Sequence, residues 1–264
     1  MHKKLLFFIT IAAFAWNGCD VIDKNDRITE IEGVVPAKKI LLLDFTDQSC
    51  VNCLKAAEEI KNLIGIYKDT LIAVSIHASD RKFPLVTEEG NKYEEYFKIE
   101  VHPTGIIDGI FSSEKPQLWG GIVLKRFQTE TSFDLNLFVS YEETKRELNV
   151  TSQIKSLQNH SRAKLLLWVI EDKINGLQLM PDGKYINDYE HNHVFRAAIN
   201  DTFGEAFTIE ENEEKDIINK AYVLNNQWET DNISIVGFVY NTSTDEVLSV
   251  TEVKLKPENN EINE

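Results

Sequence analysis

Two cysteines separated by two residues carry the strongest chemical signal in this sequence. Cys50 and Cys53 end the segment 44–53 (DFTDQSCVNC), which follows a short apolar run and precedes a stretch with helical spacing. The unpaired amides and the dipole at a helix N-terminus favour an anion, so a thiol placed there has a lowered pKa. We therefore expect Cys50 to exchange disulfides with a substrate and Cys53 to resolve the mixed disulfide.

Asp44, Pro103 and three other polar residues are further candidates for this site. Asp44 lies at the end of the apolar run, where burial would raise the pKa of its carboxyl and suit it to proton transfer. Pro103 has no N–H and cannot ligate a metal. His102 and Thr104, which flank the proline, and His77, which closes a predicted strand, are candidate substrate-contact residues.

Each of these positions also has a plain structural interpretation. Asp44 can be a turn residue at a strand end, Pro103 a strand opener and His77 a polar strand end. The cysteine pair can be an inert structural disulfide, or half of a zinc site, although the sequence has no second cysteine pair. We expect no metal and no cofactor.

The first 18 residues are typical of an export signal. Lys3 and Lys4 precede an apolar run over 5–15, which spans roughly 17 Å as a helix, about half of a bilayer core. The run therefore predicts a signal peptide rather than a transmembrane helix. Gly18 and Cys19 follow it as in a bacterial lipobox, so we expect lipidation at Cys19. The alternative is an ordinary secretory signal with a stray cysteine.

Charge and length restrict the function classes. The 264 residues include 28 Lys and Arg against 43 Asp and Glu, which gives a net charge of −15. Such a chain repels phosphate backbones and anionic headgroups, so we expect no nucleic-acid partner and membrane attachment only through the lipid anchor. An exported compartment permits a disulfide between Cys50 and Cys53.

The pattern of apolar residues predicts two folded regions. After a signal peptide (1–18) and a tether (19–36), buried strands and helices alternate over 37–130, which indicates an α/β domain. Short strands with alternating faces continue over 131–256 and predict an antiparallel, immunoglobulin-like β-sandwich. Residues 257–264 are acidic and rich in amides, and we expect a disordered tail.

The segment around the cysteines resembles thioredoxin. The resemblance rests on the strand with its Asp-Phe pair, the gap to the first cysteine, the helix that follows, and the segment 101–104 (VHPT). It implies a thioredoxin-like fold for 37–130, with Asp44 as the buried acid that takes the proton of the resolving thiol and Pro103 as the cis-proline that faces the disulfide. Val51 and Asn52 replace the Gly-Pro of thioredoxin, and Ser49 replaces its tryptophan, which leaves the direction of electron flow open.

The whole chain resembles the thioredoxin-like outer-membrane lipoproteins of the "outer membrane protein twenty-eight" related family. The lipobox, the segment 46–53 and the segment 190–204, which begins EHNHVFR, carry this resemblance, whereas Leu54 stands where members often have proline. It implies an exported, lipid-anchored protein of the bacterial cell envelope, at the outer membrane. His191, His193 and Arg196 are candidates for a functional role, with polar strand-edge positions as the default interpretation.

Two functions fit these observations. The first is a thiol–disulfide oxidoreductase that acts on exported thiol or disulfide proteins and is recycled by an unidentified redox partner. The second is a non-catalytic surface lipoprotein whose two regions bind a protein or a glycan, with a disulfide that only clips the helix start.

Overall fold

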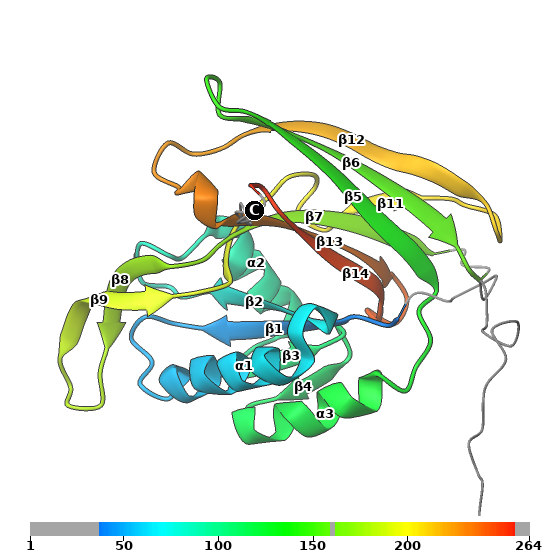
Figure 1. Cartoon of the computed structure of the whole chain (residues 1–264). Coiled ribbons are helices and arrows are strands. Elements are labelled where there is room, and N and C mark those ends of the chain that lie inside the picture. Colours follow the sequence, from blue (N-terminus) through cyan, green and yellow to red (C-terminus); the bar gives the residue numbers. More distant parts are fainter. Residues whose placement is uncertain (1–36, 159–161, 257–264) are drawn as a thin grey trace, which may run out of the picture. The chain divides into compact units, whose positions relative to one another are not determined.

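The computed structural model describes residues 37–158 and 162–256 (Figure 1). The expected signal peptide, the tether with Cys19, and the tail over 257–264 lie outside these residues. The described residues belong to one compact unit. None of the described helices combines the length and the apolar character that crossing a bilayer requires.

Strands and helices alternate in the first half of the described chain. They are β1 (Ile40–Thr46), α1 (Cys53–Tyr67), β2 (Leu71–His77), α2 (Glu88–Phe97), β3 (Thr104–Ile107), β4 (Phe111–Ser113) and α3 (Trp119–Arg126). β1 pairs with β2 in parallel and with β3 in antiparallel orientation, and β4 pairs with β3. Every residue of β1 and β2 is buried, because the strands lie inside a sheet with both faces covered.

In the described part of the second half of the chain, every regular element is a β-strand apart from one short 3₁₀ turn. Its strands are β5 (Phe133–Glu142), β6 (Glu147–Ser156), β7 (Ala163–Glu171), β8 (Ile174–Leu179), β9 (Tyr185–His191), β10 (Val194–Ala198), β11 (Glu205–Phe207), β12 (Glu214–Val223), β13 (Ile233–Asn241) and β14 (Val247–Lys254). β5, β6 and β12 form a three-stranded antiparallel sheet, and β8 and β9 form a separate hairpin. In Figure 1 this hairpin stands beside the carboxyl end of β1 and the start of α1.

One nine-stranded sheet joins the two regions that the sequence predicts as separate domains. Its order is β14-β13-β7-β10-β2-β1-β3-β4, and β11 pairs with β7. The joint is narrow: Val194 of β10 pairs with Ser75 of β2, and the Ser75 N–H donates to the His193 carbonyl at 2.7 Å. The expected boundary at 130/131 falls between α3 and β5, but it does not separate two sheets, because the later chain supplies the neighbour of β2.

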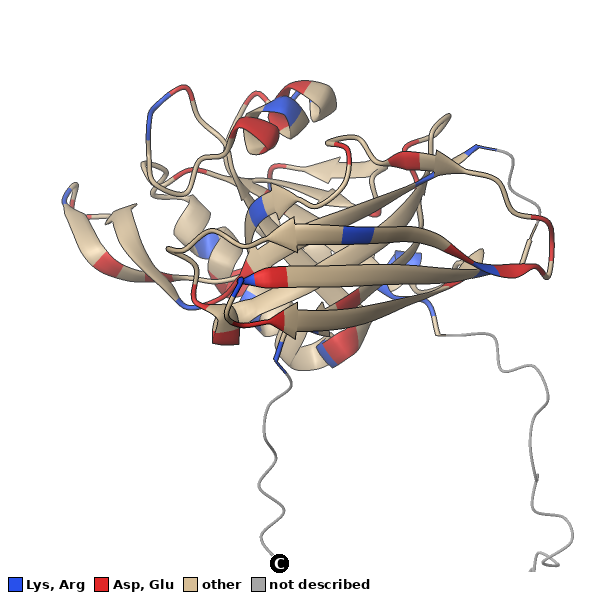
Figure 2. Ribbon diagram, turned by 90° about the horizontal axis from the view of Figure 1, so that it is seen from above, with Lys and Arg blue, Asp and Glu red and all other residues tan. Residues whose placement is uncertain are grey.

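Apolar side chains fill three layers. α1 and α3 pack on one face of β1 and β2, where the fully buried ring of Trp119 lies against Gly105, a position at which any Cβ would overlap the ring. The opposite face packs against α2 and against the folded-over strands β7, β13 and β14. The three-stranded sheet covers the outer face of β7 and β13 (Figure 1). Figure 2 shows acidic and basic residues interspersed along the strands seen from above.

A buried ionic cluster fixes the end of β1 that lies away from the cysteines. Asp108 is fully buried and accepts the Leu41 N–H at 3.0 Å. Its Oδ2 lies 2.8 Å from Arg126 Nε and 3.4 Å from Lys38 Nζ. Arg126 also pairs with Glu246, just before β14. The cluster therefore ties the entry to β1, the end of β3, helix α3 and the start of β14 together.

Candidate active site

A disulfide joins Cys50 and Cys53 at the first turn of α1, with their Cα atoms 5.4 Å apart. Cys53 is 4% exposed, while Cys50 is only partly buried. The Cys53 N–H points at the Cys50 Sγ over 3.1 Å. The first turn of α1 has no side-chain cap and no acidic residue. A thiolate at Cys50 would therefore receive an amide hydrogen bond and the full positive end of the helix dipole.

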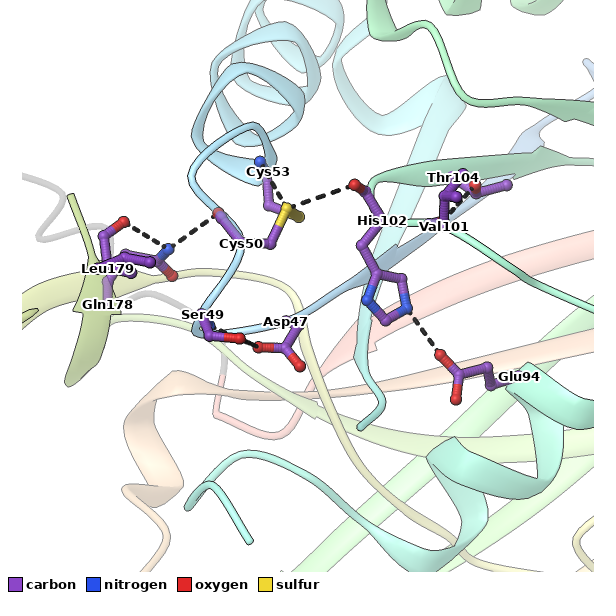
Figure 3. Close-up of a disulfide and its surroundings, with 10 residues drawn as sticks. All are labelled: Asp47, Ser49, Cys50, Cys53, Glu94, Val101, His102, Thr104, Gln178 and Leu179. Carbon is purple, nitrogen blue, oxygen red and sulfur yellow. Dashed lines mark hydrogen bonds and ion pairs between the residues drawn. A yellow bond between two sulfur atoms is a disulfide. The ribbon is translucent and has the colours of Figure 1, made fainter. Parts of the chain in front are cut away.

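The loop before β3 faces Cys50. The peptide bond between His102 and Pro103 is cis, and the carbonyl oxygen of His102 lies 3.5 Å from the Cys50 Sγ (Figure 3). The imidazole of His102 turns the other way, with Nε2 at 2.7 Å from Glu94 Oε1 of α2. Thr104 is buried, and its hydroxyl donates to the Val101 carbonyl at 2.7 Å. The loop therefore offers backbone atoms to the space beside Cys50, while its polar side chains hold its shape.

Asp44 lies in β1 opposite Gly105 of β3 and is 2% exposed. Its Oδ1 has no hydrogen-bond partner in the described part of the chain. Burial raises the pKa of this carboxyl from its ordinary 3.8 to about 7. Near neutral pH, Asp44 therefore exchanges a proton readily, as a proton carrier for a thiol must.

Two imidazoles that line the same cavity as Asp44 contact each other. His77 ends β2, and its ring meets that of His191 edge to face, with centroids 5.2 Å apart. Burial, aided by the charges of His191 and Arg196, holds the pKa of His77 well below its ordinary value, and burial lowers the pKa of His191 to about 4. Both rings are therefore neutral at pH 7. The Nδ1 of His77 is buried without a partner among the described residues.

The β8–β9 hairpin hydrogen-bonds to the cysteine loop on the side opposite the proline loop (Figure 3). The Gln178 Nε2 donates to the Cys50 carbonyl and to the Leu179 carbonyl, both at 3.2 Å. Gln48, which is fully buried, donates from Nε2 to the Leu177 carbonyl at 2.7 Å. The main-chain carbonyl of Gln48 accepts the Leu179 N–H at 2.8 Å. The hairpin is thus part of the site, although it comes from the second half of the chain.

A cavity of about 510 Å³ opens between α1 and the hairpin. Its lining comes from β1, β2, α1, the hairpin and the two residues that follow it. The lining residues are Asp44, Thr46, Cys53, Leu54, Ala57, Glu58, Ile60, Lys61, Ile64, Ser75, His77, Gln178, Tyr189, Glu190, His191, Asn192 and His193. Cys53, Asp44 and the imidazoles of His77 and His191 therefore share one cavity, to whose lining Cys50 does not contribute.

His193 and Arg196, two candidates from the segment 190–204, have structural partners. The His193 N–H donates to Asp172 Oδ1 at 2.7 Å, and the ring Nδ1 lies 3.2 Å from the same oxygen. Arg196 Nε lies 3.3 Å from Glu171 Oε2, and its guanidinium lies 5.2 Å from the centre of the Trp228 ring. These contacts hold β10 against β7 and the Trp228 loop.

Sequence reasoning did not single out Gln48, Gln178 or Tyr189, and the structure places His77, a candidate substrate-contact residue, in the wall of the cavity. Gln178 and Cys50 are 128 positions apart, so no local spacing relates them. The described residues include no group of three or more His, Cys, Asp or Glu side chains that could hold a metal ion.

Comparison with known proteins gives a family and a fold. A model of the family described as outer membrane protein Omp28 matches residues 90–259. HBP35 of Porphyromonas gingivalis is 18% identical with a TM-score of 0.70, over 83% of this chain and 76% of that protein. A structural-genomics target from Agrobacterium tumefaciens is 14% identical with a TM-score of 0.52, over 83% of this chain and 96% of that one. These two likenesses concern the fold alone.

A domain of the outer membrane lipoprotein Omp28 from Porphyromonas gingivalis is 25% identical over 48% of this chain and 90% of the domain, with a TM-score of 0.36. No curated protein matches the chain at a significant level.

Proposed function

The chain belongs to the family of outer membrane protein Omp28, and on that premise we propose that it exchanges disulfides with exported proteins through Cys50 and Cys53. The family places the protein in the bacterial cell envelope, at the outer membrane. Disulfides form and persist in exported compartments, so the pair can cycle there. The proposal includes a lipid anchor at Cys19, with the tether 19–36 between the lipid and the folded unit.

One observation carries this proposal. The disulfide lies at the uncapped start of α1, with the Cys50 Sγ 3.5 Å from the carbonyl before cis-Pro103. Behind it, the unpartnered acid Asp44 lines the same cavity as Cys53. A thioredoxin-like fold for 37–130 is part of the proposal. It is supported by the parallel β1–β2 pair, the antiparallel β3 and β4, and the helices on both faces.

The geometry assigns the steps of the exchange. A substrate thiolate attacks the Cys50 Sγ, the bond between Cys50 and Cys53 breaks, and Cys53 leaves as a thiolate that takes a proton from Asp44. A second substrate thiol, as its thiolate, then attacks the substrate sulfur of the mixed disulfide, and Cys50 leaves as a thiolate held by the Cys53 N–H. The substrate gains a disulfide and the protein becomes a dithiol, which a redox partner reoxidises. The same steps in reverse reduce a substrate disulfide.

Turnover assays test this function. We expect the protein to reduce insulin or to refold a protein with scrambled disulfides, and we expect Cys50→Ser to lower the rate to the background. Cys19→Ser removes the remaining cysteine of the chain and is the matched control, which should keep the rate. Turnover that does not depend on Cys50 would contradict the proposal. A reduction potential below about −300 mV, as structural disulfides have, would favour the non-catalytic alternative.

A further inference from the structure

The two cysteines of the Cys50–Cys53 disulfide have different surroundings. Cys50 is partly exposed and faces the cis-proline loop, which presents the His102 carbonyl. Cys53 lines the cavity of about 510 Å³ between α1 and the β8–β9 hairpin. A protein substrate is too large for that cavity and meets the disulfide at Cys50. The cavity therefore gives the second sulfur an approach that only a small molecule can use.

The floor of this cavity is polar, buried and incompletely hydrogen-bonded. Asp44 Oδ1 and His77 Nδ1 both lack a partner within the described residues, and both side chains are at most 3% exposed. A buried polar atom without a partner costs about 1–3 kcal/mol, so such a floor favours a guest with polar groups. The neutral state of His77 and His191 leaves Asp44 as the ionisable group of the floor at pH 7.

The rim of the cavity has charges of both signs. Lys61 and Glu58 project from the exposed side of α1, and Glu190 is exposed on the end of β9. A cation and two anions around one opening match a guest that bears both a carboxylate and an ammonium group. A volume of about 510 Å³ lies within the range of small-molecule sites.

We propose that this cavity binds a low-molecular-weight thiol with an amino-acid head group, which reduces the disulfide by attack on Cys53. The proposal rests on the disulfide exchange proposed above and names the donor that supplies its electrons. Lys61 holds the carboxylate, Glu58 or Glu190 holds the ammonium, and the thiol points to the floor between Asp44 and Cys53. One disulfide then serves two partners, a protein on the Cys50 side and a small thiol on the Cys53 side.

The reaction balances with two molecules of the thiol. The first gives its proton to the Asp44 carboxylate, and its sulfur attacks the Cys53 Sγ. The bond between Cys50 and Cys53 breaks, and Cys50 leaves as a thiolate that the Cys53 N–H receives. A second thiolate attacks the guest sulfur of the mixed disulfide, which releases a small disulfide, and Cys53 takes the proton from Asp44. The protein disulfide is reduced, and two thiols are oxidised to one disulfide.

A variant that fills the cavity tests the inference. Ala57 is exposed on α1 and lines the cavity, whereas Asn62 is exposed on α1 outside the lining. The probes are L-cysteine and an extended peptide with one cysteine, each added to the oxidised full chain. We expect Ala57→Trp to slow the opening of the disulfide by L-cysteine about tenfold or more, and to change the rate with the peptide less than twofold. Asn62→Trp should change neither rate.

Mapping of the trapped mixed disulfide adds a second readout. We expect L-cysteine on Cys53 and the peptide on Cys50. A third readout needs no reaction, because S-methylcysteine has no thiol. It should shift the ring resonances of His77 and His191 in the wild type and in Asn62→Trp but not in Ala57→Trp.

The outcomes separate this inference from the proposed function. If Ala57→Trp slows both probes equally or neither, or if L-cysteine is found on Cys50, the cavity is not a separate entry and the inference is overturned, while Cys50-dependent turnover stands. If neither probe opens the disulfide at all, the redox function fails and the inference fails with it.

Discussion

A buried aspartate lies near each end of strand β1. Asp44 belongs to the strand and Asp108 follows β3, and the two acids have opposite surroundings. Asp108, beside the amino end of β1, accepts the Leu41 N–H and lies within ion-pair distance of Lys38 and Arg126. Asp44, near the carboxyl end, has one oxygen without any partner in the described chain. The comparison teaches that burial alone does not define the role of an acid. A paired carboxylate fixes the fold, whereas an unpaired one exchanges a proton near neutral pH.

The neighbours explain the difference. Arg126 comes from α3 and Lys38 from the chain just before β1, so two cations converge on Asp108. Around Asp44 the cavity places Cys53 and two imidazoles that are neutral at pH 7. Among the residues that the structure describes, no cation compensates the desolvation of Asp44, so the pKa of its carboxyl rises to about 7.

The largest expected effect is at the paired acid. Asp108→Asn leaves Lys38 buried without its ion-pair partner and Arg126 with Glu246 alone, and we expect it to lower the free energy of unfolding by about 3–5 kcal/mol. Urea unfolding followed by tryptophan fluorescence measures this. The milder variant Glu246→Gln changes only the partly exposed partner of Arg126 and should cost about 1 kcal/mol or less. Equal losses in both variants would show that Asp108 is not the centre of the cluster.

At the unpaired acid, Asp44, we expect the ionisable carboxyl to lower the stability of the wild type by an amount that depends on pH. Below pH 3.8 Asp44 is protonated in both states and contributes nothing. As the pH rises to about 7, the unfolded chain releases this proton and the folded chain keeps it, so the wild type loses stability up to a plateau of about 4 kcal/mol.

Asp44→Asn removes that loss. The difference in unfolding free energy between the variant and the wild type should therefore grow from pH 4 to pH 7 and then level off, in urea titrations at each pH. A difference that stays flat across this range would mean that Asp44 is ionised in the folded protein, and the comparison with Asp108 would fail.

The same substitution should slow disulfide exchange, because an asparagine cannot give a proton to Cys53. We expect Asp44→Asn to lower the rate of insulin reduction about 100-fold at pH 7. The wild-type rate should follow the titration of a group near pH 7, and the variant should lose this dependence. Asp108→Asn, assayed in the absence of denaturant, should keep both the rate and its pH profile.

The smallest expected effect concerns the hairpin. Gln178→Met keeps the bulk of the side chain but leaves the Cys50 and Leu179 carbonyls without their donor, which we expect to cost about 1–2 kcal/mol. We expect the backbone amides of β8 and β9 to exchange hydrogen faster in this variant, which hydrogen-exchange measurements detect. Gln153→Met on β6, where the side-chain amide makes one long surface contact with Asp216, is the control and should change stability by less than about 0.5 kcal/mol. Unchanged exchange in Gln178→Met would mean that Gln48 alone holds the hairpin.

The local sequence pattern was sufficient to single out the candidate residues that lie in or beside β1, β2, β3 and the start of α1. The apolar runs of β1 and β2, the cysteine pair at a helix start, and the residues Asp44 and Pro103 lie within segments whose periodicity or spacing can be recognised. β8 and β9 are short and largely polar, so their pattern did not separate them from turns. Their contribution depends on contacts such as Gln178 with Cys50, which only the folded chain creates.

The pairing of β10 with β2, which joins the two regions in one sheet, was not predicted for a similar reason. β10 meets β2 at a single residue pair, Val194 with Ser75. An apolar run predicts that a strand is buried, but it does not say which strand lies beside it. The same limit applies to His77, whose ring contacts that of His191, a residue distant in the sequence.

Alkylation of Cys50 in the reduced protein tests the central claim most directly. The claim is that the start of α1 holds a sulfur anion beside an acid that stores a proton. With iodoacetamide and mass mapping from pH 5 to pH 10, we predict that Cys50 reacts at most of its maximal rate by pH 7 and that Cys53 lags behind it. If Cys50 reacts only as the pH passes about 8.5, as an ordinary cysteine does, the helix start does not hold the anion and the account is wrong.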